Sequence, residues 1–225
     1  MRRAWAAVRT HPSGVLLVGQ LLVVLAYPFL DHSTGGRAVL GVVQMVVVFT
    51  AVAAVRLTPA LSWVAALLGL PAMVFAVLEA LEPHTDWVVL TSAAVHAPFY
   101  FYVSYAMIRY LFHDDRVTGD ELFATGAAFT VVAWAFAYVY AAAQVVWPQS
   151  FVGASGDEQE WFNLLFLSFS NLTSVGLSDV LPVQAHARSL VMVEQVAGVL
   201  YVALVIARLV GLTVARAAAR SDEHS

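Results

Sequence analysis

The chain has 225 residues, of which 61% are hydrophobic and only 12% charged, and its mean hydropathy is +0.80. A soluble domain contains about 25% charged residues. One core of this length cannot bury so much apolar surface, so lipid must cover most of it. The chain has no cysteine, which excludes disulfides and thiolate metal sites. Its formal net charge of −4 argues against nucleic-acid binding.

Runs without charged residues delimit the stretches that can cross a bilayer, because charges are costly in hydrocarbon. Four such runs lie between residues 9 and 31, 37 and 56, 56 and 79, and 86 and 109. Each approaches the roughly 20 residues that a membrane helix needs. A fifth helix is predicted over 122–146 and a sixth over 188–215. Residues 160–179 are apolar but end in polar side chains, so they predict a re-entrant segment.

The arginines predict the orientation of these spans. Six spans leave both termini on one side, and that side collects Arg2, Arg3, Arg9, Arg56, Arg109, Arg116, Arg208, Arg216 and Arg220. The positive-inside rule therefore predicts that both termini are cytoplasmic. The re-entrant segment then enters from the opposite, acidic face, which would concentrate cations at its mouth.

The end of the re-entrant segment has an informative sequence, which reads Thr173, Ser174, Val175, Gly176, Leu177, Ser178, Asp179. It resembles the potassium-channel selectivity filter, whose commonest form is T-T-V-G-Y-G-D. Residues 166–172 resemble the pore helix of that family. Pro182, Ala187-Arg188, residues 194–211 and residues 116–118 extend the likeness to a bacterial branch of six-transmembrane potassium-channel-like proteins. It covers about residues 116–212; over the first four helices only helix number and hydropathy agree.

The resemblance implies an all-α membrane protein in which the re-entrant pore helix and filter lie between helices five and six. It implies a homotetramer, since one filter strand cannot surround an ion. Residues 1–115 would form a four-helix peripheral domain without voltage-sensor arginines, 116–215 the pore domain, and 216–225 a short cytoplasmic tail. The location implied is a bacterial cell membrane, with lipid and monovalent cations as the other partners.

The family comparison also assigns roles within the filter. A monovalent cation would bind at Ser174, Val175, Gly176 and Leu177, whose carbonyl groups can replace its hydration shell. Gly176 can adopt positive φ without strain. Apart from potassium ions in the filter we expect no cofactor. Ser170, Asn171 and Glu194 are predicted to support the filter from behind.

The filter departs from the family pattern at two positions. Leu177 replaces a tyrosine and cannot make the phenolic hydrogen bond that braces the filter. Ser178 replaces the second glycine, and a positive φ there would cost about 1 kcal/mol per subunit. Our hypothesis is a wider or more mobile outer filter with weakened potassium selectivity.

Three other residues have two readings each. Gly198 is either the hinge at which the inner helix bends during gating or a site of close helix packing. Glu194 is a structural residue behind the filter, either hydrogen-bonded to Asn171 or Ser170 or protonated and inert, or it is a pore-lining charge, since an intramembrane carboxylate suggests function. His96 is a pH sensor or a histidine hydrogen-bonded to a neighbouring helix.

No catalytic pattern, phosphate loop or metal-ligand spacing is present in the sequence, so we expect no enzyme. The leading prediction is a passive cation channel that conducts potassium. The alternatives are a non-selective cation channel and a non-conducting membrane scaffold whose filter has collapsed. A secondary transporter ranks lower, because no inverted repeat is visible.

Overall fold

The computed structural model describes residues 12–30, 33–55, 62–82, 85–112, 119–153 and 159–222. This part of the chain contains seven helices and two short strands. They are α2 (Pro12–Leu30), α3 (Thr34–Val55), α4 (Ser62–Leu81), α5 (Asp86–Leu111), α6 (Gly119–Val146), β1 (Phe151–Val152), α7 (Trp161–Leu172), β2 (Leu181–Pro182) and α8 (Ala185–Asp222). A helix is found at each predicted span, and α7 occupies the first part of the predicted re-entrant segment. The all-α class is therefore confirmed.

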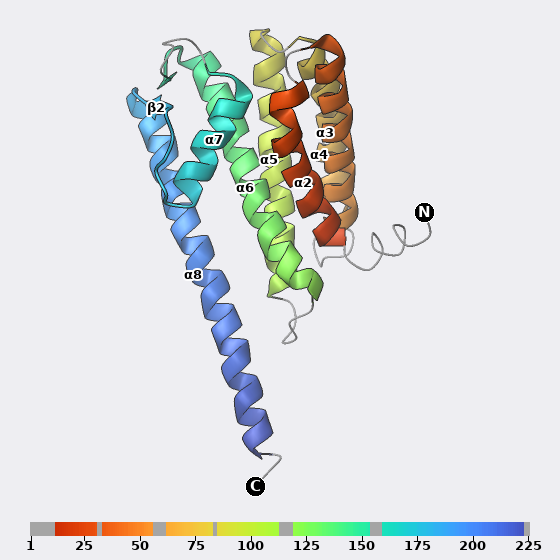
Figure 1. Cartoon of the computed structure of the whole chain (residues 1–225), viewed down its shortest axis with the longest axis vertical. Coiled ribbons are helices and arrows are strands. Elements are labelled where there is room, and N and C mark those ends of the chain that lie inside the picture. The colour runs from red at the N-terminus through yellow and green to blue at the C-terminus, as the bar shows by residue number, and fades with distance from the viewer. Residues whose placement is uncertain are drawn as a thin grey trace.

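The helices form a bundle with one long helix at its side (Figure 1). Helices α2 to α5 pack against one another, and both α2 and α5 pack against α6. The short helix α7 lies between α6 and α8 and contacts both. Helix α8 extends well beyond the bundle and is longer at both ends than the predicted 188–215. It therefore includes most of the residues predicted as a tail.

Three of the helices are long and apolar enough to cross a membrane, counted over the residues described above. Their apolar stretches are Ser13–Leu30, Leu122–Val146 and Ala185–Arg208. A shorter apolar stretch, Trp63–Glu79, lies in α4. Membrane crossing by α3, α4 and α5 stays a prediction. Most arginines that predicted the orientation lie outside the described residues or have side chains that are not described.

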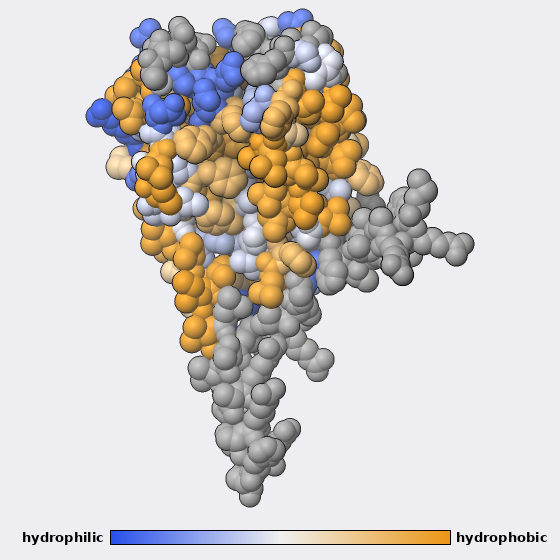
Figure 2. Space-filling view, in the orientation of Figure 1, coloured by the Kyte–Doolittle hydropathy of each residue, from blue (hydrophilic) through white to orange (hydrophobic). Residues whose placement is uncertain are grey.

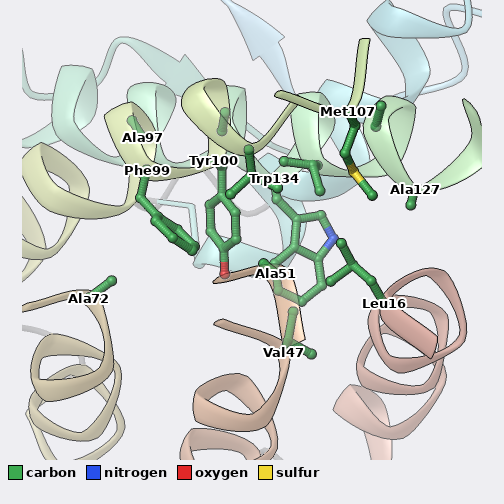
Figure 3. Packing of buried hydrophobic residues seen from close by; sticks show 14 of the residues in the cluster. Leu16, Val47, Ala51, Ala72, Ala97, Phe99, Tyr100, Met107, Ala127 and Trp134 are labelled. Atoms are coloured by element: carbon green, nitrogen blue, oxygen red, sulfur yellow. The ribbon is translucent and has the colours of Figure 1, made fainter. Parts of the chain in front are cut away.

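The main core lies where α5 meets α6, with α2 and α3 covering it (Figure 3). Trp134 and Tyr100 are fully buried there, and their rings meet edge to face at 5.8 Å. Alanines along both helices let the backbones approach closely; Ala97, Ala106, Ala124, Ala127, Ala128 and Ala135 are buried. Tight packing of this kind holds the peripheral helices against α6.

The outer surface of the protein is largely apolar around its middle. In Figure 2, hydrophobic residues cover this zone and hydrophilic residues gather at the upper end, where β2 lies in Figure 1. Helix α8 is the least covered helix. Its exposed apolar side chains, each 45–61% exposed, are Met192, Val193, Val196, Val199, Leu200, Val202, Leu204, Ile206 and Val210. Such a continuous apolar strip must meet lipid or other protein.

Candidate functional site

The filter-like residues begin where α7 ends, in a Schellman-type helix cap. The N–H of Val175 donates to the carbonyl of Ser170 at 3.1 Å, and the N–H of Ser174 donates to that of Asn171 at 3.0 Å. Ser174 has φ 60°, the left-handed conformation that this cap requires of the residue that follows the C-cap. The N–H of Gly176 also donates to the Ser170 carbonyl, at 3.1 Å. The first half of the loop is thus anchored on the last turn of α7.

The left-handed positions of the loop differ in part from those expected. Gly176 has φ 71°, which confirms the positive φ expected there. Ser178 does not have positive φ, so the strain that a positive φ would cause there does not arise; Ser174 is the serine with positive φ in this loop. The hydroxyl of Ser178 instead accepts the N–H of Val180 at 3.1 Å. A serine can thus close a local turn without the left-handed conformation that glycine favours.

The loop lies on an open face of the protein. Val175 is 59% exposed and Leu177 is 75% exposed. A Cβ on Gly176 would meet nothing within 4 Å. Thr173, Ser174 and Asp179 are also exposed, whereas Ser178 is half-buried. The backbone of the predicted filter is therefore accessible to an ion, a solvent molecule or another chain.

The predicted filter-support residues contact the loop by backbone rather than by side chain. The carbonyls of Ser170 and Asn171 accept the loop hydrogen bonds described above. Their side chains are buried, and neither Ser170 Oγ nor Asn171 Nδ2 has a hydrogen-bond partner within the described part of the chain. Of the two partners expected for Glu194, Ser170 makes no side-chain hydrogen bond to a described residue, whereas the side chain of Asn171 lies beside the Glu194 carboxyl group.

Glu194 is fully buried between α6, α7 and α8. Tyr140 Oη donates to its Oε2, and its Oε1 is hydrogen-bonded to Ser168 Oγ. Ser168 Oγ also lies 2.8 Å from the carbonyl oxygen of Ala133 in α6. The carboxyl group thus joins three helices, a geometry that favours the brace reading. The sequence offered only weak signals for Tyr140 and Ser168, namely a hydroxyl within each apolar helix.

Gly198 lies one turn beyond Glu194 and faces the end of α7. A Cβ at this position would lie 2.1 Å from the carbonyl oxygen of Leu172. The close-packing reading of Gly198 has direct geometric support, because only glycine allows this approach. Helix α8 is continuous through the residue. The hinge reading stays a prediction.

Both ends of the α7–loop segment are tied to the end of α6. The side chain of Gln144 donates to the carbonyl of Gln159 at 3.0 Å and accepts its N–H at 2.9 Å. After the loop, β2 pairs antiparallel with β1, and Gln184 Nε2 donates to the carbonyl of Pro148 at 2.8 Å. These hydrogen bonds hold the chain in place both before α7 and after the loop. Sequence reasoning missed them, since a two-residue strand carries no pattern.

His96 lies away from the loop, in the core between α5 and α6. It is fully buried, and its ring stacks on Tyr138 of α6 with centroids 4.5 Å apart. Its Nδ1 lies 2.9 Å from the Ser92 carbonyl of its own helix. The Ser92 hydroxyl donates to Glu79 of α4 at 2.5 Å. The hydrogen bond to a neighbouring helix expected for His96 is therefore replaced by one within α5.

A family model described as an ion channel matches residues 125–215, which is less than half of the chain. The matched part runs from α6 through α7 and the loop into α8. Searches of curated proteins and of solved structures gave no match. The family match supports an ion channel in a membrane rather than an enzyme. It agrees with the resemblance noted in the sequence over the pore segment.

Proposed function

We propose that the protein is a passive channel for monovalent cations, with potassium as the first candidate ion. The observation that carries the proposal is the exposed loop 173–179, with Ser174 and Gly176 in the left-handed region. Left-handed residues at every second position can turn successive carbonyls toward one side, and such carbonyls can replace water around a cation. The ion-channel family match covers the same residues.

The channel is a homotetramer in this proposal, with the four loops around one axis. A single loop presents one set of carbonyls and cannot enclose an ion. The exposed strip on α8 and the exposed Val175 and Leu177 lie in the half of the subunit that would face the other copies. Helices α2 and α5 pack against α6 on the far side from α8, and together with α3 and α4 they would form a collar toward lipid.

The proposal includes six membrane spans, with both termini in the cytoplasm of a bacterial cell. The six helices and the arginine distribution support it. The β1–β2 end then faces outward, and α8 continues beyond the bundle into the cytoplasm. Voltage gating is not expected, because among the described residues α5 carries a single arginine, Arg109, in its last turn.

Selectivity for potassium is weak in this proposal, and the reason lies at the outer end of the loop. The alternation of left-handed residues continues through Gly176 and stops before Ser178. The outermost carbonyls would then lack the arrangement that the inner ones have. Leu177 also offers no hydroxyl to brace this end. A filter with fewer ordered carbonyl rings discriminates less strongly between potassium and sodium.

The deciding experiment is current through purified protein in liposomes with opposed potassium and sodium gradients. A reversal potential close to zero, moving toward the potassium value in the double variant Leu177→Tyr/Ser178→Gly, would support a weakly selective channel. If the native protein instead has a reversal potential at the potassium value, the proposed weak selectivity is contradicted, but the channel function is still supported. Leu67→Tyr is the matched control, because Leu67 is exposed on α4, far from the loop along the chain.

A non-conducting scaffold is the alternative from a different functional class. It is favoured by the same exposed loop, because Val175 and Leu177 could close an apolar contact between copies instead of lining a path. Silence in the native protein together with current in the double variant would support this alternative. Chemical crosslinking would still show the tetramer, so assembly and conduction are tested separately.

A further inference from the structure

We propose that Glu194 is a neutral carboxylic acid whose proton positions Ser168, and with it α7 and the filter loop. Loss of this proton would reduce conduction. The proposal deepens the channel function by adding a control of its filter, and its conduction readout rests on that function. Glu194 is a positioning residue here, since it acts on the loop through α7.

The hydroxyl group of Ser168 has fewer protons than contacts. A serine hydroxyl has one proton to donate, and a backbone carbonyl oxygen can only accept. Ser168 Oγ lies within hydrogen-bond distance of two oxygens, the carbonyl oxygen of Ala133 at 2.8 Å and Oε1 of Glu194, and we assign its one proton to the Ala133 carbonyl. The contact between Ser168 Oγ and Glu194 Oε1 then needs a proton from Glu194. Only the protonated carboxyl group can supply it.

The second carboxyl oxygen completes the assignment. Tyr140 Oη donates to Glu194 Oε2, which is the acceptor oxygen of a neutral acid. Ala133 and Tyr140 are seven residues apart in α6, so they lie two turns apart on one face of that helix. The network therefore fixes α7 and α8 at two levels of α6.

The surroundings of Glu194 contain no charge that would stabilise an ionised form. From α6 the titratable group facing it is Tyr140, and from α7 the neighbours are the uncharged Ser168 and Asn171. Among the described residues no arginine pairs with it, and it is fully buried. A buried carboxylate without a cation is strongly disfavoured.

The loss of the proton would act on the filter through α7. An ionised Glu194 only accepts hydrogen bonds, so Ser168 would have to turn its proton away from Ala133. The hydrogen bond between Ser168 of α7 and the Ala133 carbonyl of α6 would then break. Two residues further along α7, the carbonyl of Ser170 holds the N–H groups of Val175 and Gly176. A shift of α7 therefore moves the anchored half of the loop.

The first test reads the proton directly and needs no conduction. Infrared spectra of the native protein and of Glu194→Gln are subtracted at neutral pH, which isolates the carbonyl band of a protonated Glu194. The proposal expects this band to be present in the native protein. A carboxylate signal in its place would overturn the proposal, whether or not the protein conducts ions.

The second test measures how the loss of the Glu194 proton changes ion flux. Native flux in liposomes should fall about tenfold for each pH unit beyond the point at which the acid band disappears, because the protonated fraction falls likewise. Glu194→Gln keeps one donor and one acceptor but does not titrate, so its flux should stay within about twofold across the same range. Unchanged native flux after the band has disappeared would overturn the proposal. Glu79→Gln, on α4, is the matched control and should keep the native pH profile.

The two tests separate this proposal from the channel function. If no variant conducts at any pH, the channel function fails, and the infrared band still decides whether Glu194 carries a proton. If the native protein conducts ions and the infrared band of protonated Glu194 is absent, the channel function is supported and the proposed role of Glu194 is wrong.

Discussion

Gly198 faces the backbone of Leu172 so closely that a Cβ would lie 2.1 Å from the Leu172 carbonyl oxygen. One turn earlier on each helix, Glu194 contacts Ser168. Helices α8 and α7 are thus matched turn by turn along this stretch. The end of α7 and the loop that it anchors depend on this contact.

Replacement of Gly198 by alanine should displace α7 or α8 and destabilise the protein. Overpacking of this kind costs about 1–3 kcal/mol. Thermal unfolding in detergent would measure the loss, and flux would report the effect on the loop. Gly211→Ala is the matched control on the same helix, because a Cβ there meets nothing within 4 Å. A Gly198→Ala protein as stable as the Gly211→Ala protein would contradict the close contact.

Replacement of Ser174 by glycine should stabilise the cap of α7. Ser174 has φ 60°, where a residue with a side chain loses about 1 kcal/mol relative to glycine. Thermal unfolding in detergent is the measurement. Ser178→Gly is the comparison, and it should lower stability slightly, since Ser178 has no positive φ and its hydroxyl accepts the Val180 N–H. The opposite ranking of the two variants would show that the left-handed serine is assigned to the wrong position.

Replacement of Tyr140 by phenylalanine should weaken the brace around Glu194. The change leaves Glu194 Oε2 buried without its donor, and an unsatisfied buried polar group costs about 1–3 kcal/mol. Tyr105→Phe is the control, because Tyr105 is 53% exposed on α5. Equal unfolding temperatures for both variants would argue against a hydrogen bond at Tyr140.

Replacement of Gln144 by alanine should loosen the start of α7. The side chain makes two hydrogen bonds to the backbone of Gln159, each with a net contribution of about 1 kcal/mol. Hydrogen exchange at the first turn of α7 should become faster in this variant. Gln195→Ala is the control, since Gln195 is exposed on α8. Unchanged exchange in Gln144→Ala would mean that α7 is held by its other contacts.

The sequence by itself determined the helices and the place of the loop. Charge-free runs mark five of the six long helices, because a charge in the middle of an apolar helix is costly wherever that helix is buried, and only the sixth contains a carboxyl group, Glu194, in its middle. The heptapeptide from Thr173 to Asp179 marks the loop, and Gly176 has the positive φ expected of it. These features depend on local chemistry, which can be read from neighbouring residues.

Only the tertiary structure decided which residues hold the loop. Glu194 is hydrogen-bonded to Ser168 and Tyr140, two residues that the sequence did not single out. The partners come from three helices, and the rotation of each helix about its axis follows from packing along its whole length. The positive φ of Ser174 likewise follows from the cap that α7 forms with the loop, a pattern of backbone hydrogen bonds that no residue type specifies alone.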